Sequence, residues 1–178
     1  VWTPQEYSIE YNNNIVLYSP KPEPLPEPEV IPENPMKYTV EDGFTLYNPS
    51  IEGYIFKGWI EDGEESYEAR EVYTLEKGTS GDKKLSAVWI PVEYSISYDF
   101  NGGEVDDSEP QTFLFGQESP EIIEPVLPFY EFVGWIDENR GLLEPDKTLD
   151  TSVAGDASLK AIWRPEEYDV EYDLDGGE

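Results

Sequence analysis

The feature that most constrains this chain is a ten-residue motif, W-x-P-x-E-Y-x-[IV]-x-Y, that occurs at residues 2–11, 89–98 and 163–172. The copies start 87 residues apart (2 to 89) and then 74 residues apart (89 to 163). These periods are too long for the coils of a solenoid and are typical of small domains, so each copy should have its own core. We therefore predict tandem beads-on-a-string domains: a first at 1–91, a second at 92–165, and the first strand of a third at 166–178.

Two further motifs recur inside the first two copies. F-x-G-W occupies 56–59 and 132–135, and G-D-x-x-L-x-A-[VI]-W occupies 81–89 and 155–163. The second copy is therefore a shorter version of the first, built on the same pattern of large apolar residues.

The extra length of the first copy coincides with a Pro-rich insertion at 20–35, in which Pro recurs with Glu. Proline rings fix φ and like charges repel, so this segment should be an extended, projecting loop between the first and second strands. Its interpretation as a ligand for an aromatic groove competes with the simpler interpretation as a tolerated surface insertion, which we favour.

The apolar residues recur with the period of β-strands. At 94–100 the large residues Tyr94, Ile96, Tyr98 and Phe100 alternate with polar ones, as in a half-buried strand. Turn residues follow, Asn-Gly-Gly at 101–103 and Asp-Gly-Gly at 175–177. Helical spacing is confined to short windows at 64–72 and 119–123. We predict a mainly β fold with at most one short helix per repeat.

The composition excludes several classes of function. The chain has 40 Asp plus Glu against 11 Lys plus Arg, a net charge of −29, which opposes binding to nucleic acids and to anionic lipid surfaces. It has no Cys and no His, which excludes thiolate nucleophiles, Cys/His zinc sites and imidazole-based triads. The apolar runs are too short to span a membrane, so we expect no membrane insertion by this fragment, with any export signal or anchor outside it.

These motifs resemble the Listeria-Bacteroides repeat, the B-repeat module of internalin-type bacterial surface proteins. The resemblance rests on K-Y-T-V-E-D at 37–42, G-Y-I-F-K-G-W at 53–59, Y-D-F-N-G-G at 98–103 and the closing L-K-A-I-W at 159–163. The sequence departs from the family pattern where Asn-Asn-Asn and the insertion replace Asn-Gly-Gly, and where Phe129 and Tyr130 replace Gly-Tyr.

The resemblance implies a compact β-grasp-like module of exported bacterial surface proteins, used as a spacer and in some cases for adhesion. It supplies no catalytic residues. We therefore expect a non-enzymatic, extracellular stalk segment of a cell-surface protein, without cofactors, whose partners are the neighbouring repeats of the same chain. The alternative is an adhesin module that binds a host or surface protein or a glycan through the Pro-rich loop or a sheet edge.

The acidic loop at 99–107 is a weak candidate for a Ca²⁺ site. Its oxygen ligands would come from Asp99, Asn101, Glu104, Asp106 and Asp107. The loop lacks the ordered spacing and the terminal bidentate Glu of an EF-hand, so we expect no metal site there.

The recurring tryptophans allow two interpretations. Trp59, Trp89, Trp135 and Trp163 could form a carbohydrate platform on the surface. We favour core positions instead, because a domain of about 74 residues buries only about 60% of its unfolded surface and needs large side chains to be stable.

Overall fold

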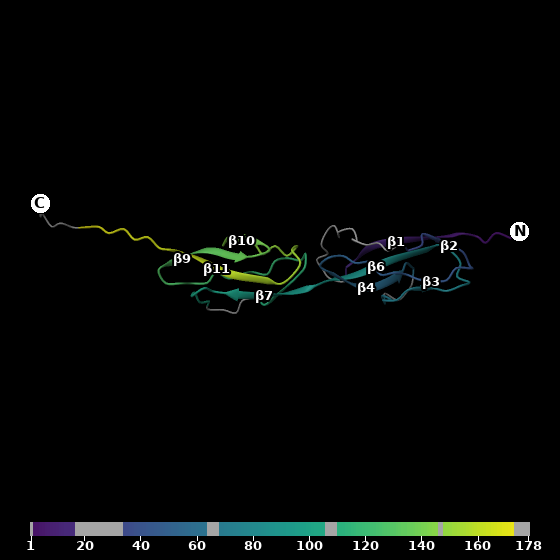
Figure 1. The fold of residues 1–178 in the computed structure, drawn as a ribbon, viewed down its shortest axis with the longest axis horizontal. Coiled ribbons are helices and arrows are strands. Elements are labelled where there is room, and N and C mark those ends of the chain that lie inside the picture. Colours follow the sequence, from purple (N-terminus) through teal and green to yellow (C-terminus); the bar gives the residue numbers. More distant parts are fainter. Residues whose placement is uncertain (1, 17–33, 64–67, 106–109, 146–147, 173–178) are drawn as a thin grey trace. The chain divides into compact units, whose positions relative to one another are not determined.

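The fold is known from a computed structural model, which describes residues 2–16, 34–63, 68–105, 110–145 and 148–172. All regular secondary structure in these residues is β-strand, and they contain no helix (Figure 1). The prediction of a mainly β fold is confirmed. The window 119–123 has no regular structure, and Pro125 shortly after it disfavours continuation of a helix. Residues 64–67 of the other window lie outside the described residues, and 68–72 contains no helix.

The chain divides into two compact units. Unit 1 comprises Val1–Tyr94 together with Phe113–Glu118 and Thr151–Gly155, and unit 2 comprises Ser95–Thr112, Ser119–Asp150 and Asp156–Glu178. Unit 1 thus includes two short segments that belong to the second repeat by sequence.

In the first repeat, the first and last strands are parallel and lie side by side in the middle of a four-stranded sheet of order β2-β1-β6-β4 (Figure 1). The outer strands pair antiparallel with these two. A separate two-stranded ribbon pairs β3 with β5. The strands are β1 (Tyr7–Val16), β2 (Lys37–Tyr38), β3 (Phe44–Thr45), β4 (Tyr54–Glu61), β5 (Thr74–Leu75) and β6 (Lys83–Pro91).

The second repeat has the same arrangement, in a five-stranded sheet of order β10-β9-β11-β7-β8. Its first strand β7 is parallel to its last strand β11, which also pairs antiparallel with β9 (Figure 1). The strands are β7 (Glu93–Asp99), β8 (Thr112–Leu114), β9 (Tyr130–Asp137), β10 (Gly141–Leu143) and β11 (Ala157–Pro165). In the first repeat, the Pro-rich insertion at 20–35 lies between β1 and β2, as predicted.

The F-x-G-W motif forms a β-bulge in each repeat. The pairing register shifts between Phe56 and Gly58 in β4, and at the matching place opposite β9. A Cβ on Gly58 would overlap the backbone of Arg70, and one on Gly134 would overlap the Leu143 carbonyl. Glycine is needed here because the following segment passes directly against the bulge.

Each unit has its own aromatic interior of the same geometry. In unit 1 the Phe56 ring lies edge-on to Trp59 and Trp89, with centroid distances of 5.4 and 5.2 Å. In unit 2 the Phe132 ring contacts Trp135 and Trp163 in the same way, at 5.4 Å each. Edge-to-face contacts of this kind add to the stabilisation that burial of the rings provides. The recurring aromatic residues thus line two separate interiors.

Candidate functional site

In the described part of the acidic loop, the Asp99 carboxylate is already paired with groups of the same chain. One Asp99 carboxylate oxygen accepts a hydrogen bond from the Asn101 N–H at 3.0 Å, and the other pairs with the Lys160 ammonium at 3.2 Å. The Asn101 N–H, together with the charge of Lys160, lowers the pKa of Asp99. Glu104 pairs through its backbone with Val126, and Asp106 and Asp107 lie outside the described residues. Among the described residues no three His, Cys, Asp or Glu side chains form a metal-binding group.

The tryptophans do not form a surface platform. Trp59, Trp89 and Trp135 are buried, and Trp163 is half-buried with its Nε1–H donating to the Phe100 carbonyl at 3.1 Å. Trp2, in contrast, is 97% exposed. Four of the five indoles therefore serve the interiors of the two units.

A carboxylate stands two residues after the F-x-G-W tryptophan in each repeat, buried at Asp137 and half-buried at Glu61. In unit 2, Asp137 accepts N–H groups of Ser158, Asn139 and Arg140 at 2.7 to 2.9 Å and faces the Arg140 guanidinium at 3.4 Å. Burial alone would raise the pKa of Asp137, but these donors and the Arg140 charge lower it. Because its partners lie on β11 and in the turn after β9, the Asp137 carboxylate connects β9 to β11.

The matching position of unit 1 is Glu61, which pairs with Lys83 at 2.6 Å and accepts the Tyr73 hydroxyl at 2.9 Å. Burial opposes ionisation of Glu61, yet the Lys83 and Tyr73 contacts leave its pKa below the usual value. Different partners therefore stabilise equivalent carboxylates in the two units.

In each repeat a tyrosine hydroxyl of the first strand holds the segment that leads into the second strand. The Tyr11 hydroxyl donates to the Pro35 carbonyl at 2.7 Å, and the Tyr98 hydroxyl donates to the Pro110 carbonyl at 2.8 Å. Burial raises the pKa of Tyr11 to about 12, which keeps its proton in place as a donor. The first contact spans 24 residues and the second spans 12, so the same contact forms in the repeat with the insertion and in the repeat without it. Residues 17–33, which include most of the insertion, lie outside the described residues.

The end of unit 1 where β6 leaves the sheet is a covered surface. We call the residues Gly53, Tyr54, Pro91 and Val92 the end face of unit 1. The Val92 N–H donates to the Gly53 carbonyl at 2.8 Å, and the Val92 carbonyl accepts the Phe115 N–H at 3.0 Å. The Phe115 ring lies edge-on to Tyr54 at 5.4 Å and fills the space that a side chain on Gly53 would need.

The equivalent end face of unit 2 consists of Phe129, Tyr130, Pro165 and Glu166. Its inner hydrogen bond is present, since the Glu166 N–H donates to the Phe129 carbonyl at 2.9 Å. Phe129, however, is 72% exposed and Tyr130 is 42% exposed, whereas Tyr54 is only 8% exposed. Phe129 has a φ of 68°, close to the 76° of Gly53, so the turn is the same although the residue is large.

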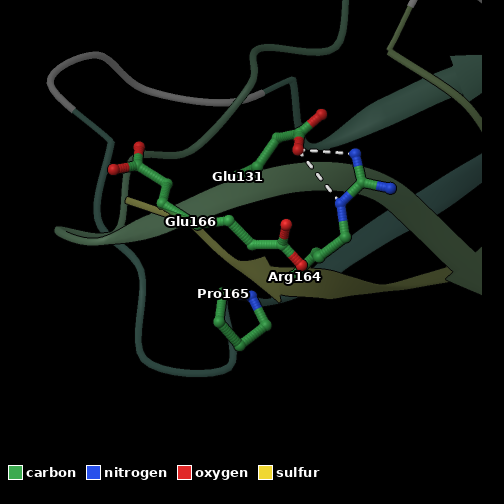
Figure 2. Close-up of a pocket in the computed structure, with 5 residues that line it drawn as sticks. Glu131, Arg164, Pro165 and Glu166 are labelled. Atoms are coloured by element: carbon green, nitrogen blue, oxygen red, sulfur yellow. Dashed lines mark hydrogen bonds and ion pairs between the residues drawn. The ribbon is translucent and has the colours of Figure 1, made fainter. Parts of the chain in front are cut away.

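A polar pocket of 460 Å³ borders this end face (Figure 2). Figure 2 shows the Arg164 guanidinium turned toward Glu131, to which it donates from Nε at 3.0 Å and from a terminal nitrogen at 2.5 Å. Pro165, Glu166 and Glu167 complete the lining. An exposed apolar pair next to a charged rim is typical of a protein-binding surface.

Sequence patterns alone did not identify the end faces. Their signal was nevertheless visible, because Phe129 stands where the first copy has Gly53. An exposed aromatic residue in a turn that favours glycine carries a conformational cost, which makes Phe129 a candidate contact residue.

Comparisons with known proteins agree with the internal repeat. The model of the Listeria-Bacteroides repeat domain matches residues 32–88 and 94–162. A "Putative Gly-rich membrane protein" of Evansella cellulosilytica is 33% identical over 130 residues, and a "Putative membrane protein" of the same organism is 32% identical over 133 residues. Each match covers 72% of this chain, which spans only 14% and 18% of those two relatives.

No solved structure matches the chain. No helix in the described part of the chain has both the length and the apolar composition needed to cross a membrane. The two matched segments together cover well over half of the sequence, and they coincide with the two repeats. The chain therefore belongs to the Listeria-Bacteroides repeat domain family.

Proposed function

We propose that this chain is a non-enzymatic stalk segment of a bacterial cell-surface protein, in which successive repeats hold another part of the protein at a distance. The observation that carries this proposal is the pair of separate aromatic interiors, around Trp59 and Trp89 in one unit and Trp135 and Trp163 in the other. Repeats that each bury their own apolar residues can be added in series without changing the fold of their neighbours.

The connection between the repeats supports a spacer. Only Val92 separates β6 from β7, and its N–H and carbonyl are both hydrogen-bonded within unit 1. Pro91 is buried and has a fixed φ. A connection of this length and bonding allows far fewer backbone conformations than a Gly/Ser linker does.

The charge of the chain also supports this role. At a net charge of −29, successive segments repel one another, which opposes folding back and self-association. The printed names of the two longer relatives describe membrane proteins, and a surface location for this chain is proposed by extension from them and from the family.

Spin labels at Glu76→Cys and Glu138→Cys test the spacer directly. Both positions are exposed, and the native chain has no other cysteine. We expect a narrow distribution of label-to-label distances in the native sequence. A Gly-Ser-Gly-Ser insertion after Val92 should broaden it, whereas the same insertion within residues 20–33 should leave it unchanged and serves as the control.

Two outcomes contradict the proposal. One is a native distance distribution as broad as that of the Val92 insertion variant, which would indicate a free hinge. The other is a radius of gyration of about 16 Å by small-angle scattering, the value expected for one compact globule of this length.

A further inference from the structure

The end face of unit 2 is an exposed apolar surface whose counterpart in unit 1 is covered. The two faces share their turn conformation and their inner backbone hydrogen bond, from Val92 to Gly53 and from Glu166 to Phe129. They differ in what covers them. Phe115 lies on the first, whereas Phe129 and Tyr130 remain exposed on the second.

We propose that the end face of unit 2 docks the turn of a following repeat, at the position equivalent to Phe115, and that this position must there carry a residue smaller than Phe. The inference rests on the proposed function, because only a series of repeats provides such a partner. It adds to that function by naming the surface that joins one repeat to the next and the property that selects the partner.

The identity of the occupant follows from the chain itself. The turn that covers the first end face is closed by a hydrogen bond from the Gln117 N–H to the Leu114 carbonyl at 3.2 Å. The repeat motif begins again at 163–172, as it does at 89–98 before that turn. A repeat that begins at Glu166 would therefore place its own turn beside Phe129, and the Glu166 carbonyl would accept the N–H that Phe115 donates to Val92.

The size requirement follows from packing. In unit 1 the Phe115 ring fills the space that a Cβ on Gly53 would occupy, so a large covering residue requires glycine beneath it. In unit 2 a large residue, Phe129, stands at the position equivalent to Gly53. Two phenyl rings at this contact would overlap, and relieving the overlap would displace the backbone hydrogen bonds on both sides.

The first repeat shows that a smaller covering residue is compatible with the turn. Its equivalent turn is closed by a hydrogen bond from the Asp42 N–H to the Thr39 carbonyl at 3.0 Å, and it carries Val40 where the second repeat has Phe115. Val40 is exposed in this structure. A large covering residue would pair with glycine beneath it, and a small covering residue would pair with Phe beneath it. Such pairs would specify which repeats can be neighbours, because the wrong partner is excluded.

The test is a double-mutant cycle in a chain in which a copy of residues 93–165 follows Glu166 in place of residues 167–178. Four such chains combine Phe129 or Phe129→Gly with the native Phe or a Val at the position copied from Phe115. Hydrogen exchange is measured at the copied turn amide, which would donate to Glu166. The amides of β4 and β6 report in every chain that unit 1 is folded.

We expect protection in the two complementary chains, Phe129 with Val and Phe129→Gly with Phe. In the chain with Phe at both positions the turn amide should exchange roughly tenfold faster or more. Equal effects of the Phe-to-Val change on both backgrounds would overturn the proposal, because independent sites show no coupling.

The outcome is distinguishable from failure of the stalk itself. The labels at positions 76 and 138 report on the first connection in the same chains. A narrow distribution there, with no coupling at position 129, refutes the docking inference alone, whereas a broad distribution in all four chains contradicts the stalk.

Discussion

The carbonyl carbon of Arg70 lies 2.5 Å from the point where a Cβ on Gly58 would stand. This closeness exists because the Trp59 N–H donates to the Arg70 carbonyl and the Trp59 carbonyl accepts the Arg70 N–H, both at 2.9 Å. The bulge in F-x-G-W turns the backbone so that a strand-like segment can pair at its outer edge. The same motif in the second repeat accommodates β10 against β9.

Gly58→Ala should lower the free energy of unfolding by about 3 kcal/mol or more, because the new methyl group meets backbone atoms that cannot move away independently. The matched control is Gly63→Ala. Gly63 also has a positive φ, of 92°, but has open space around it, so it should cost only about 1–2 kcal/mol of backbone strain. Urea unfolding curves measure both changes. Equal losses would show that φ alone requires glycine at position 58.

Trp135→Ala should destabilise unit 2 by about 3–5 kcal/mol, the usual loss for removing a buried indole. Trp135 contacts the rings of Tyr98, Phe100 and Phe132. Trp2→Ala, at a side chain that is 97% exposed, is the control and should change nothing measurable. Hydrogen exchange should show lost protection in β9 and β11 with β4 and β6 still protected. Simultaneous loss in all four strands would mean that the two interiors unfold as one.

Acid should remove the contribution of Asp137. Its pKa is lowered in the folded chain, so its stabilising effect is complete above the unfolded pKa of about 3.9 and is lost as the pH falls toward the lower folded value. At pH 7, Asp137→Asn should lower the free energy of unfolding by about 3 kcal/mol, because it leaves the Arg140 charge without its buried partner.

The difference between the native chain and Asp137→Asn should shrink below about pH 4. Comparing the two chains cancels the general effect of acid on a protein of net charge −29. If the difference in free energy of unfolding stays constant down to acid unfolding, the ionised Asp137 carboxylate does not stabilise the fold.

Deleting residues 20–32 should leave the fold and its stability nearly unchanged. The loop is held by Tyr11 and Pro35 whether it is long or short, and halving a loop changes its closure entropy by only about 0.6 kcal/mol. Deleting 20–35 instead removes the Pro35 carbonyl and Asn34, which exchanges two hydrogen bonds with the Tyr47 backbone at 2.9 Å. That longer deletion should lower the melting temperature.

The same pair of deletions separates the stalk from the adhesive alternative. A stalk keeps its distance distribution between positions 76 and 138 when residues 20–32 are absent. If a surface protein or glycan binds the native chain on an array and does not bind the shorter deletion, the insertion is a ligand.

Millimolar Ca²⁺ should leave the melting temperature unchanged, since Asp99 already pairs with Lys160 and with the Asn101 N–H. Sodium chloride of equal ionic strength is the control, because screening alone stabilises a strongly acidic chain. A rise specific to Ca²⁺ that Asp99→Asn abolishes would establish a site in the 99–107 loop.

Much of this architecture could be predicted from the sequence. The alternation of large and polar residues at 94–100 specified a half-buried strand, because side chains in a strand point to opposite faces at every step. The recurring Phe and Trp positions specified buried interiors, because small domains require large apolar side chains. These are local or compositional properties, and each copy contains them in full.

Only the tertiary structure decided which residues of each repeat contact one another. Three contacts between residues distant in sequence show this: Phe115 lies over Gly53, the Tyr11 hydroxyl binds the Pro35 carbonyl, and Asp137 joins β9 to β11. The amino-acid pattern determines which residues must be buried, since that depends on each side chain and its period along the chain. Which residues meet depends on how the strands pair and where the chain turns, and only the folded backbone fixes those positions.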